Sequence, residues 1–287
     1  DLERRIEHEL RRIEGIFSAW DKDSEISKLN ASQSRLPLTV SEDLAYLSSL
    51  SLEIAKKTDG AFDPTIGELL SARGLGPLGE KGLRSEKEIQ EILTRTGYLH
   101  IRSGKNWIQR NDARIQLNLT SIVDGYAADR IFELLKEQKQ EIFLVEIGGE
   151  LRASLPPQDR DSWDVRLESG EDTFSGIFPL RQMALSTSGI YRHRVSGEGK
   201  EHSHIINPRT GQSMEAIEVA SVAGPLCVTA DALSTAIIAA GPDQAIRMMK
   251  QFPGYEYRFV LSGSGQVIQS PEMGKIFADT DRKSSGK

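Results

Sequence analysis

The spacing of hydrophobic residues changes along this chain of 287 residues, and that change most limits what it can fold into. In residues 1–18, apolar side chains recur every three or four positions, as on one face of an amphipathic helix. In residues 98–119 they recur at every second position, which is typical of β-strands. No linker, internal repeat or low-complexity tract separates the two kinds of segment. The sequence therefore predicts an α+β fold, with mixed, largely antiparallel sheets and packed helices.

The same patterns give an expected order of elements. Besides residues 1–18, helices are expected at 41–58, 85–96, 125–138 and 231–240. A hairpin is expected within 98–119, with Asn111-Asp112 as its turn, and further strands at 143–147, 163–168, 175–186, 202–206, 217–223 and 256–268. The lack of a linker predicts one integrated domain over residues 1–277, followed by a polar tail at 278–287.

The composition of the chain argues against several classes of protein. The net charge of −6 and the 6% aromatic content disfavour a nucleic-acid binder, which needs a basic face or a base-stacking platform. The single cysteine, Cys227, excludes an internal disulfide and a zinc site with several cysteines. No apolar run reaches the roughly 18 residues that span a bilayer. We therefore expect a soluble, mildly acidic globular protein, and its composition is compatible with an enzyme.

The segment ADALSTA at 230–236 is the strongest local signal for a metal site. Asp231 and Thr235 are four residues apart, so on a helix they share one face. A carboxylate and a hydroxyl form an oxygen-only pair, which suits Mg²⁺ and is poor for zinc. The alternative is helix capping by Asp231. The spacing by itself leaves both interpretations open.

Five other segments are compatible with ligand binding or with ordinary turns. GAFDPTIG at 60–67 is either a backbone cradle or a tight turn after a helix. LNLTSIVDGYAADR at 117–130 runs from a strand into a helix start, which can face an anion, and lacks a P-loop lysine. EIGGEL at 146–151 permits close approach of a ligand to Gly-Gly. STSGIYR at 186–192 and HSHIINPRTG at 202–211 offer hydroxyls and a histidine pair, or simply a polar strand face.

Taken in order, these motifs resemble the ApbE family. The series runs from SAWDKDSEISKLN through GAFDPTIG, DGYAADR, LVEIGGELR, STSGIYR and HSHIINPRTG to ADALSTA, and the resemblance covers about residues 5–270. Members of this family are FAD:protein FMN transferases, formerly called thiamine biosynthesis lipoproteins. The resemblance implies an ApbE-like fold in one integrated globule.

The resemblance also implies an activity. It predicts a Mg²⁺-dependent enzyme that moves FMN from FAD onto a threonine hydroxyl of a target redox protein as a phosphoester, releasing AMP. Mg²⁺ would sit at the pyrophosphate of FAD, where it neutralises charge and positions the phosphates. The alternatives are an FAD pyrophosphatase that makes FMN and AMP, and a non-catalytic FAD-binding protein. A generic envelope binding protein is a further, less fitting class.

The family's site residues fall on particular positions of this chain. The metal ligands match Asp231 and Thr235, with a backbone carbonyl near Val123, and Asp231 and His204 match catalytic positions. His204, in the family's H-[IV]-[IL]-D-P segment, is the candidate for proton handling. The cofactor contacts match residues from six of the motifs: Asn30, Phe62, Asp63, Asp124, Tyr126, Gly148, Gly149, Thr187, Ser188, Gly189, Tyr191 and His204.

Two positions depart from the family's common pattern. Asp124 stands where many relatives have a lysine that would pair with phosphate, so Asp124 would repel phosphate unless a cation intervenes. It is therefore also a candidate contributor to the metal site. Asn207 replaces the aspartate of H-[IV]-[IL]-D-P, which changes a turn or an indirect contact rather than the chemistry.

The resemblance finally implies partners and a location. The acceptor is expected to be a subunit of a membrane redox complex that carries a Thr-containing flavinylation motif, and no nucleic acid is expected. The location is expected to be periplasmic or otherwise extracytoplasmic. Contact with the membrane is expected only through a lipid anchor that is absent from this chain.

Overall fold

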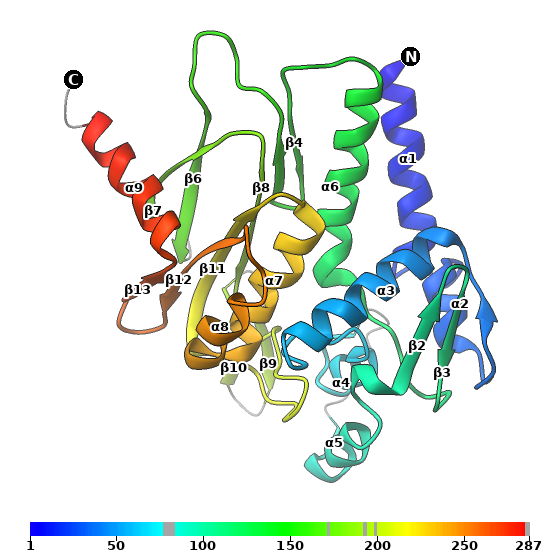
Figure 1. Ribbon diagram of the computed structural model, residues 1–287. Coiled ribbons are helices and arrows are strands. Elements are labelled where there is room, and N and C mark those ends of the chain that lie inside the picture. The colour runs from blue at the N-terminus through cyan, green and yellow to red at the C-terminus, as the bar shows by residue number, and fades with distance from the viewer. Residues whose placement is uncertain (77–83, 171–172, 192–193, 198–199, 285–287) are drawn as a thin grey trace. The chain divides into compact units, whose positions relative to one another are not determined.

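The structure is a computed structural model that describes residues 1–76, 84–170, 173–191, 194–197 and 200–284 (Figure 1). Its chain forms two compact units. Apart from Asp1 and Leu2, unit 1 contains residues 3–123 and 194–214, and unit 2 contains residues 124–193 and 215–287. The single integrated domain over 1–277 stays a prediction.

Unit 1 is mainly helical, with short strands. Its helices are α1 (Leu2–Phe17), α2 (Glu25–Ala31), α3 (Glu42–Lys57), α4 (Gly67–Ala72), α5 (Glu86–Leu93) and the 3₁₀ turn η1 (Tyr98–His100). Its strands are β1 (Leu38–Thr39), β2 (Ile101–Gly104), β3 (Trp107–Arg110), β9 (Arg194–Gly197) and β10 (Lys200–Ser203). Helix α6 (Thr120–Glu137) begins at the end of unit 1 and continues into unit 2.

Local sequence explains the helix starts in unit 1. The Ser41 side chain caps α3 by accepting from the Leu44 N–H, and Ser85 and Glu88 form a capping box on α5. Helix α3 packs on the antiparallel sheet β1-β3-β2. A separate core joins α4, α5 and Ile206 through the buried residues Leu69, Leu70, Ala72, Ile89, Ile92 and Ile206.

Unit 2 is built around an antiparallel sheet in the order β13-β12-β11-β8-β5-β4. These strands are β4 (Leu144–Ile147), β5 (Glu150–Ala153), β8 (Ala184–Gly189), β11 (Ile217–Gly224), β12 (Glu256–Leu261) and β13 (Val267–Gln269). A hairpin of β6 (Trp163–Gly170) and β7 (Thr173–Leu180) also belongs to this unit. The helices are the rest of α6, α7 (Cys227–Ala240), α8 (Pro242–Met249) and α9 (Pro271–Ser284).

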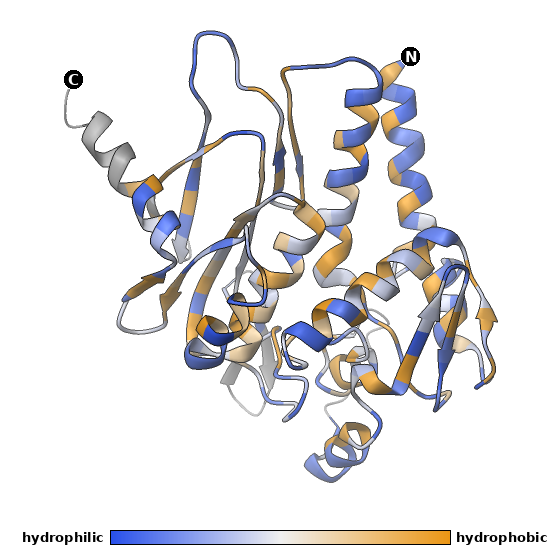
Figure 2. Cartoon of the chain, viewed as in Figure 1, coloured by the Kyte–Doolittle hydropathy of each residue, from blue (hydrophilic) through white to orange (hydrophobic). Residues whose placement is uncertain are grey.

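Helix α7 packs against β8 and β11 of the large sheet (Figure 1). Every residue of α7 except Thr235 and Ala240 is buried. Figure 2 accordingly shows α7 as mostly hydrophobic, whereas α1 is mostly hydrophilic. A helix that is apolar all round belongs in a protein core, so a charged residue in it calls for a specific explanation.

The α+β prediction, with largely antiparallel sheets, is confirmed, and several boundaries differ. The hairpin turn lies at Lys105-Asn106, between β2 and β3, rather than at Asn111-Asp112. The strand expected at 202–206 ends at Ser203, so His204 lies outside the strand. The strand expected at 175–186 is two strands, β7 and β8, and α9 extends to Ser284. In the part of the chain that the structure describes, no helix is both long and apolar enough for a bilayer crossing.

Candidate functional site

Asp231 is the only charged residue of α7, and its side chain is almost fully enclosed, with 4% of the residue exposed. Its Oδ2 atom accepts a hydrogen bond of 2.9 Å from the backbone N–H of Gly125 on α6. Burial raises the pKa of the Asp231 carboxyl to about 7, and the negative charge of Asp124 adds to the rise. The hydrogen bonds that Asp231 receives therefore do not fully offset the cost of burying its negative charge.

The Gly-Gly pair at 148–149 makes room for Asp124. Gly148 and Gly149 form the two-residue turn between β4 and β5, with φ of +65° and +100°. Such angles favour glycine at both positions. A Cβ atom at Gly148 would lie 2.6 Å from Asp124 Oδ2, so the carboxyl of Asp124 rests directly against the turn. Asp124 keeps an exposed face, yet loss of water around its carboxyl raises its pKa as well.

Glu150 is a third acidic residue here, and the sequence analysis did not select it. It begins β5 immediately after the Gly-Gly turn, is 7% exposed and hydrogen-bonds with the Asp231 side chain. Ser186 Oγ donates to Glu150 Oε1 at 3.2 Å. The sequence shows an acidic residue after Gly-Gly, whereas its burial and its hydrogen bonds come only from the fold.

A row of hydroxyls continues from Glu150 to Thr235. Ser234 Oγ lies 3.1 Å from Ser186 Oγ and 2.7 Å from Ser188 Oγ, and Ser188 Oγ lies 3.1 Å from Thr235 Oγ1. Because residues alternate along β8, Ser186 and Ser188 both face α7. The structure thus places Ser188 beside Thr235, one helical turn from Asp231, and adds Ser186 and Ser234 to the row.

The other predicted residues of unit 2 have different surroundings. Thr187 points to the opposite face of β8 and hydrogen-bonds with Ser221 Oγ at 2.9 Å. The Tyr191 ring packs on Gly189, where a Cβ would lie 2.4 Å from it, and the Tyr191 hydroxyl donates to Glu168. Tyr126 is buried on α6.

In unit 1, Asn30 acts as a bracket for an extended segment. Its Nδ2 donates to the Leu117 carbonyl and its Oδ1 accepts from the Leu117 N–H, both at 2.8 Å. The buried Arg110, which the sequence analysis missed, donates to the carbonyls of Ile115 and Ser32 at 2.8 Å and of Asn30 at 3.4 Å. Arg110 therefore fixes the end of α2 against residue 115, and Asn30 fixes residue 117.

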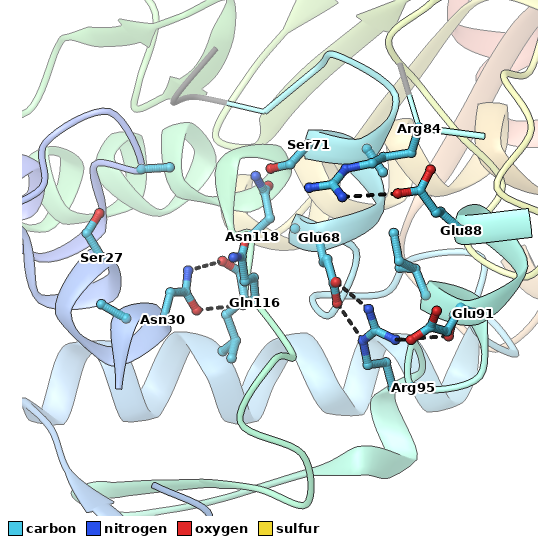
Figure 3. Close-up of a pocket in the computed structure, with 16 residues that line it drawn as sticks. Ser27, Asn30, Glu68, Ser71, Arg84, Glu88, Glu91, Arg95, Gln116 and Asn118 are labelled. Carbon is cyan, nitrogen blue, oxygen red and sulfur yellow. Dashed lines mark hydrogen bonds and ion pairs between the residues drawn. The ribbon is translucent and has the colours of Figure 1, made fainter. Parts of the chain in front are cut away.

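This bracket borders a cavity of about 380 Å³ in unit 1. Figure 3 shows Asn30, Gln116 and Asn118 on one side and Glu68, Arg84, Glu88 and Arg95 on the other. Arg95 forms two hydrogen bonds with the Glu68 carboxylate, and Arg84 pairs with Glu88 at 3.1 Å. The cavity is therefore polar, with amides and paired charges available for a ligand.

Neither Phe62 nor Asp63 is among the residues that line this cavity. Phe62 is 3% exposed, and the Asp63 carboxylate accepts from the Thr65 N–H and hydroxyl and from the Tyr98 N–H. Their segment is thus a tightly bonded turn. His204 lies half-buried just beyond β10, and Val123 ends the first of the two stretches that make up unit 1, residues 3–123.

The Asp231 surroundings contain oxygen donors only. Asp231, Asp124 and Glu150 supply carboxylates and Thr235 supplies a hydroxyl, the donor types that hard cations prefer. Within the described ranges, no group of three or more His, Cys, Asp or Glu side chains is already arranged as a metal cage. The pattern fits a cation with few protein ligands.

The sequence profile of the ApbE family matches residues 2–259. The chain belongs to the ApbE family. It is 30% identical over 260 residues to the FAD:protein FMN transferase of Escherichia coli K12, a match that covers 88% of this chain and 74% of the relative. Among solved structures, the apo flavinyl transferase ApbE of Pseudomonas stutzeri is 28% identical with a TM-score of 0.86, covering 96% of this chain and 88% of that one. The ApbE protein of Thermotoga maritima is also 28% identical, with a TM-score of 0.87 and coverages of 96% and 91%.

These matches confirm the predicted ApbE-like fold and the prediction of an enzyme of this family. They also place the acidic surroundings of Asp231 within the region that the family profile covers. The assignments of individual ApbE site residues, including Asp124 in place of the common lysine, stay predictions.

The raised carboxyl pKa values predict how stability depends on pH. An acid whose pKa is higher in the folded state binds more protons when folded, so stability is lost as pH rises through that interval. For Asp231 the interval runs from its ordinary 3.8 to about 7. In EDTA, we expect the free energy of unfolding to fall by about 2–4 kcal/mol between about pH 5 and about pH 8. Urea unfolding at several pH values measures it.

Asp231→Asn is the control for this pH dependence, because it removes the titrating group and keeps an oxygen for the Gly125 N–H. Its unfolding free energy should change much less over the same range. A wild-type protein whose stability is flat or rises towards about pH 8 would contradict the electrostatic description of this site.

Proposed function

We propose that the protein transfers FMN from FAD to a threonine hydroxyl of an acceptor protein. The threonine oxygen attacks the FMN-side phosphorus, the bond to the AMP phosphate breaks, AMP leaves and the hydroxyl proton passes to a base. The observation that carries the proposal is the buried Asp231 beside Asp124, Glu150 and Thr235, in a chain of the ApbE family. Membership supports it because curated relatives are FAD:protein FMN transferases.

We further propose that Mg²⁺ is held by Asp231 and Thr235, with a backbone carbonyl at Val123. The donor set fits this cation, because all its atoms are oxygens and because burial leaves the Asp231 charge short of compensation. Bound there, Mg²⁺ would neutralise pyrophosphate charge and polarise the phosphorus. It would also remove the repulsion between Asp124 and a phosphate.

The chain's own residues bind and orient in this proposal. Gly125 fixes the Asp231 carboxylate through its N–H, and Ser188 and Ser234 orient the Thr235 hydroxyl. Asn30 is proposed as a contact of the flavin nucleotide, because it matches the position of that contact in the family's motif. His204 is proposed as the base that takes the threonine proton.

A transfer assay tests the proposed function. The protein is incubated with FAD, Mg²⁺ and an acceptor carrying a Thr-containing flavinylation motif, and a denaturing gel is scanned for flavin fluorescence. We expect a fluorescent acceptor band and AMP in equal amounts. An acceptor with that threonine changed to alanine is the matched control and should stay dark.

The rival functions give other results in the same assay. FMN and AMP without a labelled acceptor indicate an FAD pyrophosphatase, in which water takes the place of threonine. Bound FAD with neither product indicates a binding protein. Either result would replace the transferase proposal.

We also propose an extracytoplasmic location, periplasmic in a bacterium with two membranes. The acceptor would then be a subunit of a membrane redox complex, and a lipid anchor would hold the enzyme near it. Fractionation of cells that express the native gene tests this proposal. The protein should be found in the periplasmic or membrane fraction, and recovery in the cytoplasmic fraction would contradict it.

A further inference from the structure

Helix α7 lacks a cap from its own sequence. Its N-cap residue is Leu226, which has no polar side chain, and no side-chain cap hydrogen bond comes from it. The first N–H groups of a helix nevertheless need acceptors, above all when they are buried. Cys227 and Val228, the first two residues of α7, are both buried.

Asp129, from α6, supplies the missing acceptors. Its Oδ1 accepts from the Cys227 N–H at 3.0 Å, and its Oδ2 accepts from the Val228 N–H at 2.9 Å. Arg152 on β5 pairs with Asp129 Oδ1 at 2.8 Å and stacks over the Phe132 ring. The arginine and the positive end of the α7 dipole stabilise the carboxylate, while its burial raises its pKa.

A second contact joins the same two helices one turn away. Gly125 lies four residues before Asp129, so both are on one face of α6. Its N–H donates to Asp231, and a Cβ at Gly125 would lie 2.5 Å from the Cys227 carbonyl oxygen. Helix α6 therefore holds α7 at two points, the N-terminus through Asp129 and the Asp231 carboxylate through Gly125.

We propose that Asp129 is a positioning residue for the Asp231 site. It touches neither Asp231 nor, in the proposed function, the substrate. Asp129 fixes the first turn of α7. It therefore also fixes the position of the Asp231 carboxylate, which lies one turn later in the helix. The effect on turnover rests on the proposed function, whereas the effect on α7 does not.

Hydrogen exchange followed by NMR, on the full chain in EDTA, tests the positioning itself. In Asp129→Asn, one acceptor and the ion pair with Arg152 are lost, so the Cys227, Val228 and Gly125 amides should exchange about tenfold faster or more. Val260→Ala, in the core of β12, is the matched control, because removing buried methyl groups there is expected to lower the melting temperature as well. It should leave those three amides as protected relative to the rest of the chain as in the wild type.

A Mg²⁺ titration of the melting temperature gives the second readout. The Mg²⁺ concentration that gives half the stabilisation should rise about tenfold or more in Asp129→Asn and stay near the wild-type value in Val260→Ala. If Asp129→Asn does not fold, Asp129→Glu takes its place in both experiments. It keeps the negative charge, so its effects on amide exchange and on the half-saturating Mg²⁺ concentration should have the same sign and be smaller.

The outcomes separate the two proposals. Unchanged Gly125 exchange in Asp129→Asn, or equal changes in Val260→Ala, overturns the positioning role. If wild-type protein shows no stabilisation by Mg²⁺ and no turnover, the proposed function fails, and amide exchange alone still decides the role of Asp129.

Discussion

Asp231→Asn is expected to keep the fold and to lose about a thousandfold of the Mg²⁺-dependent cleavage of FAD. The asparagine oxygen can still accept from the Gly125 N–H, so the contact between α6 and α7 remains. The negative charge that would hold the cation is gone, and Lewis-acid assistance of several kcal/mol corresponds to about this factor in rate. Release of AMP and FMN, followed with and without Mg²⁺, measures the loss.

Stability distinguishes this explanation from simple damage to the protein. At about pH 8 in EDTA, the wild type bears the cost of a buried charge that Asp231→Asn lacks. The variant should therefore be at least as stable as the wild type there, while it is inactive. Asp243→Asn, on the exposed start of α8, is the matched control and should keep wild-type turnover. An Asp231→Asn protein with wild-type Mg²⁺ dependence would remove Asp231 from the metal site.

The start of helix α7 could not be predicted from the local sequence alone. Its predicted start was Asp231, because an acidic residue before an apolar run is typical of a helix N-terminus. The helix begins at Cys227, one turn earlier, and its capping acceptor comes from Asp129, 98 residues before it in the chain. The capping alternative for Asp231 is therefore wrong, since this side chain lies within the helix and accepts from Gly125.

The segment after the β2–β3 hairpin illustrates the same limit in unit 1. The alternation of Ile115, Leu117 and Leu119 predicted a strand, and these side chains are indeed buried. No strand of the sheet β1-β3-β2 runs through them. The Asn30 amide takes the place of a neighbouring strand by pairing with the Leu117 N–H and carbonyl. Periodicity thus predicted the buried face correctly. The hydrogen-bond partners are the distant Asn30 side chain for Leu117 and the backbone of residues 64–67 for Gln116 and Asn118.

Helix propensity and capping signals were sufficient where the partners are local. Helices α1, α3 and α5 lie within a few residues of their predicted bounds. Each has its apolar spacing, and α3 and α5 have their serine caps, within the same short stretch of sequence. Ordered motifs identified the family, and the roles of Asp231, Thr235, Ser188 and the Gly-Gly turn that come with it stay predictions. Glu150, Arg110 and Asp129 escaped, because each acts through contacts that only the folded chain makes.

Gly125→Ala is expected to lower the free energy of unfolding by about 1–3 kcal/mol and to reduce turnover sharply. The added methyl would lie 2.5 Å from the Cys227 carbonyl oxygen and 2.8 Å from Asp231 Cβ, so the start of α7 must move away from α6. Both points of contact, the Gly125 N–H to Asp231 and Asp129 to the α7 N-terminus, would lengthen with it. Urea unfolding and FAD cleavage measure the two effects.

Gly15→Ala on the exposed face of α1, where nothing lies within 4 Å, is the matched control. There the same substitution should raise stability by about 0.5–1 kcal/mol and leave turnover unchanged, so a Gly125→Ala protein that behaves like it would show that α6 and α7 do not need this close approach.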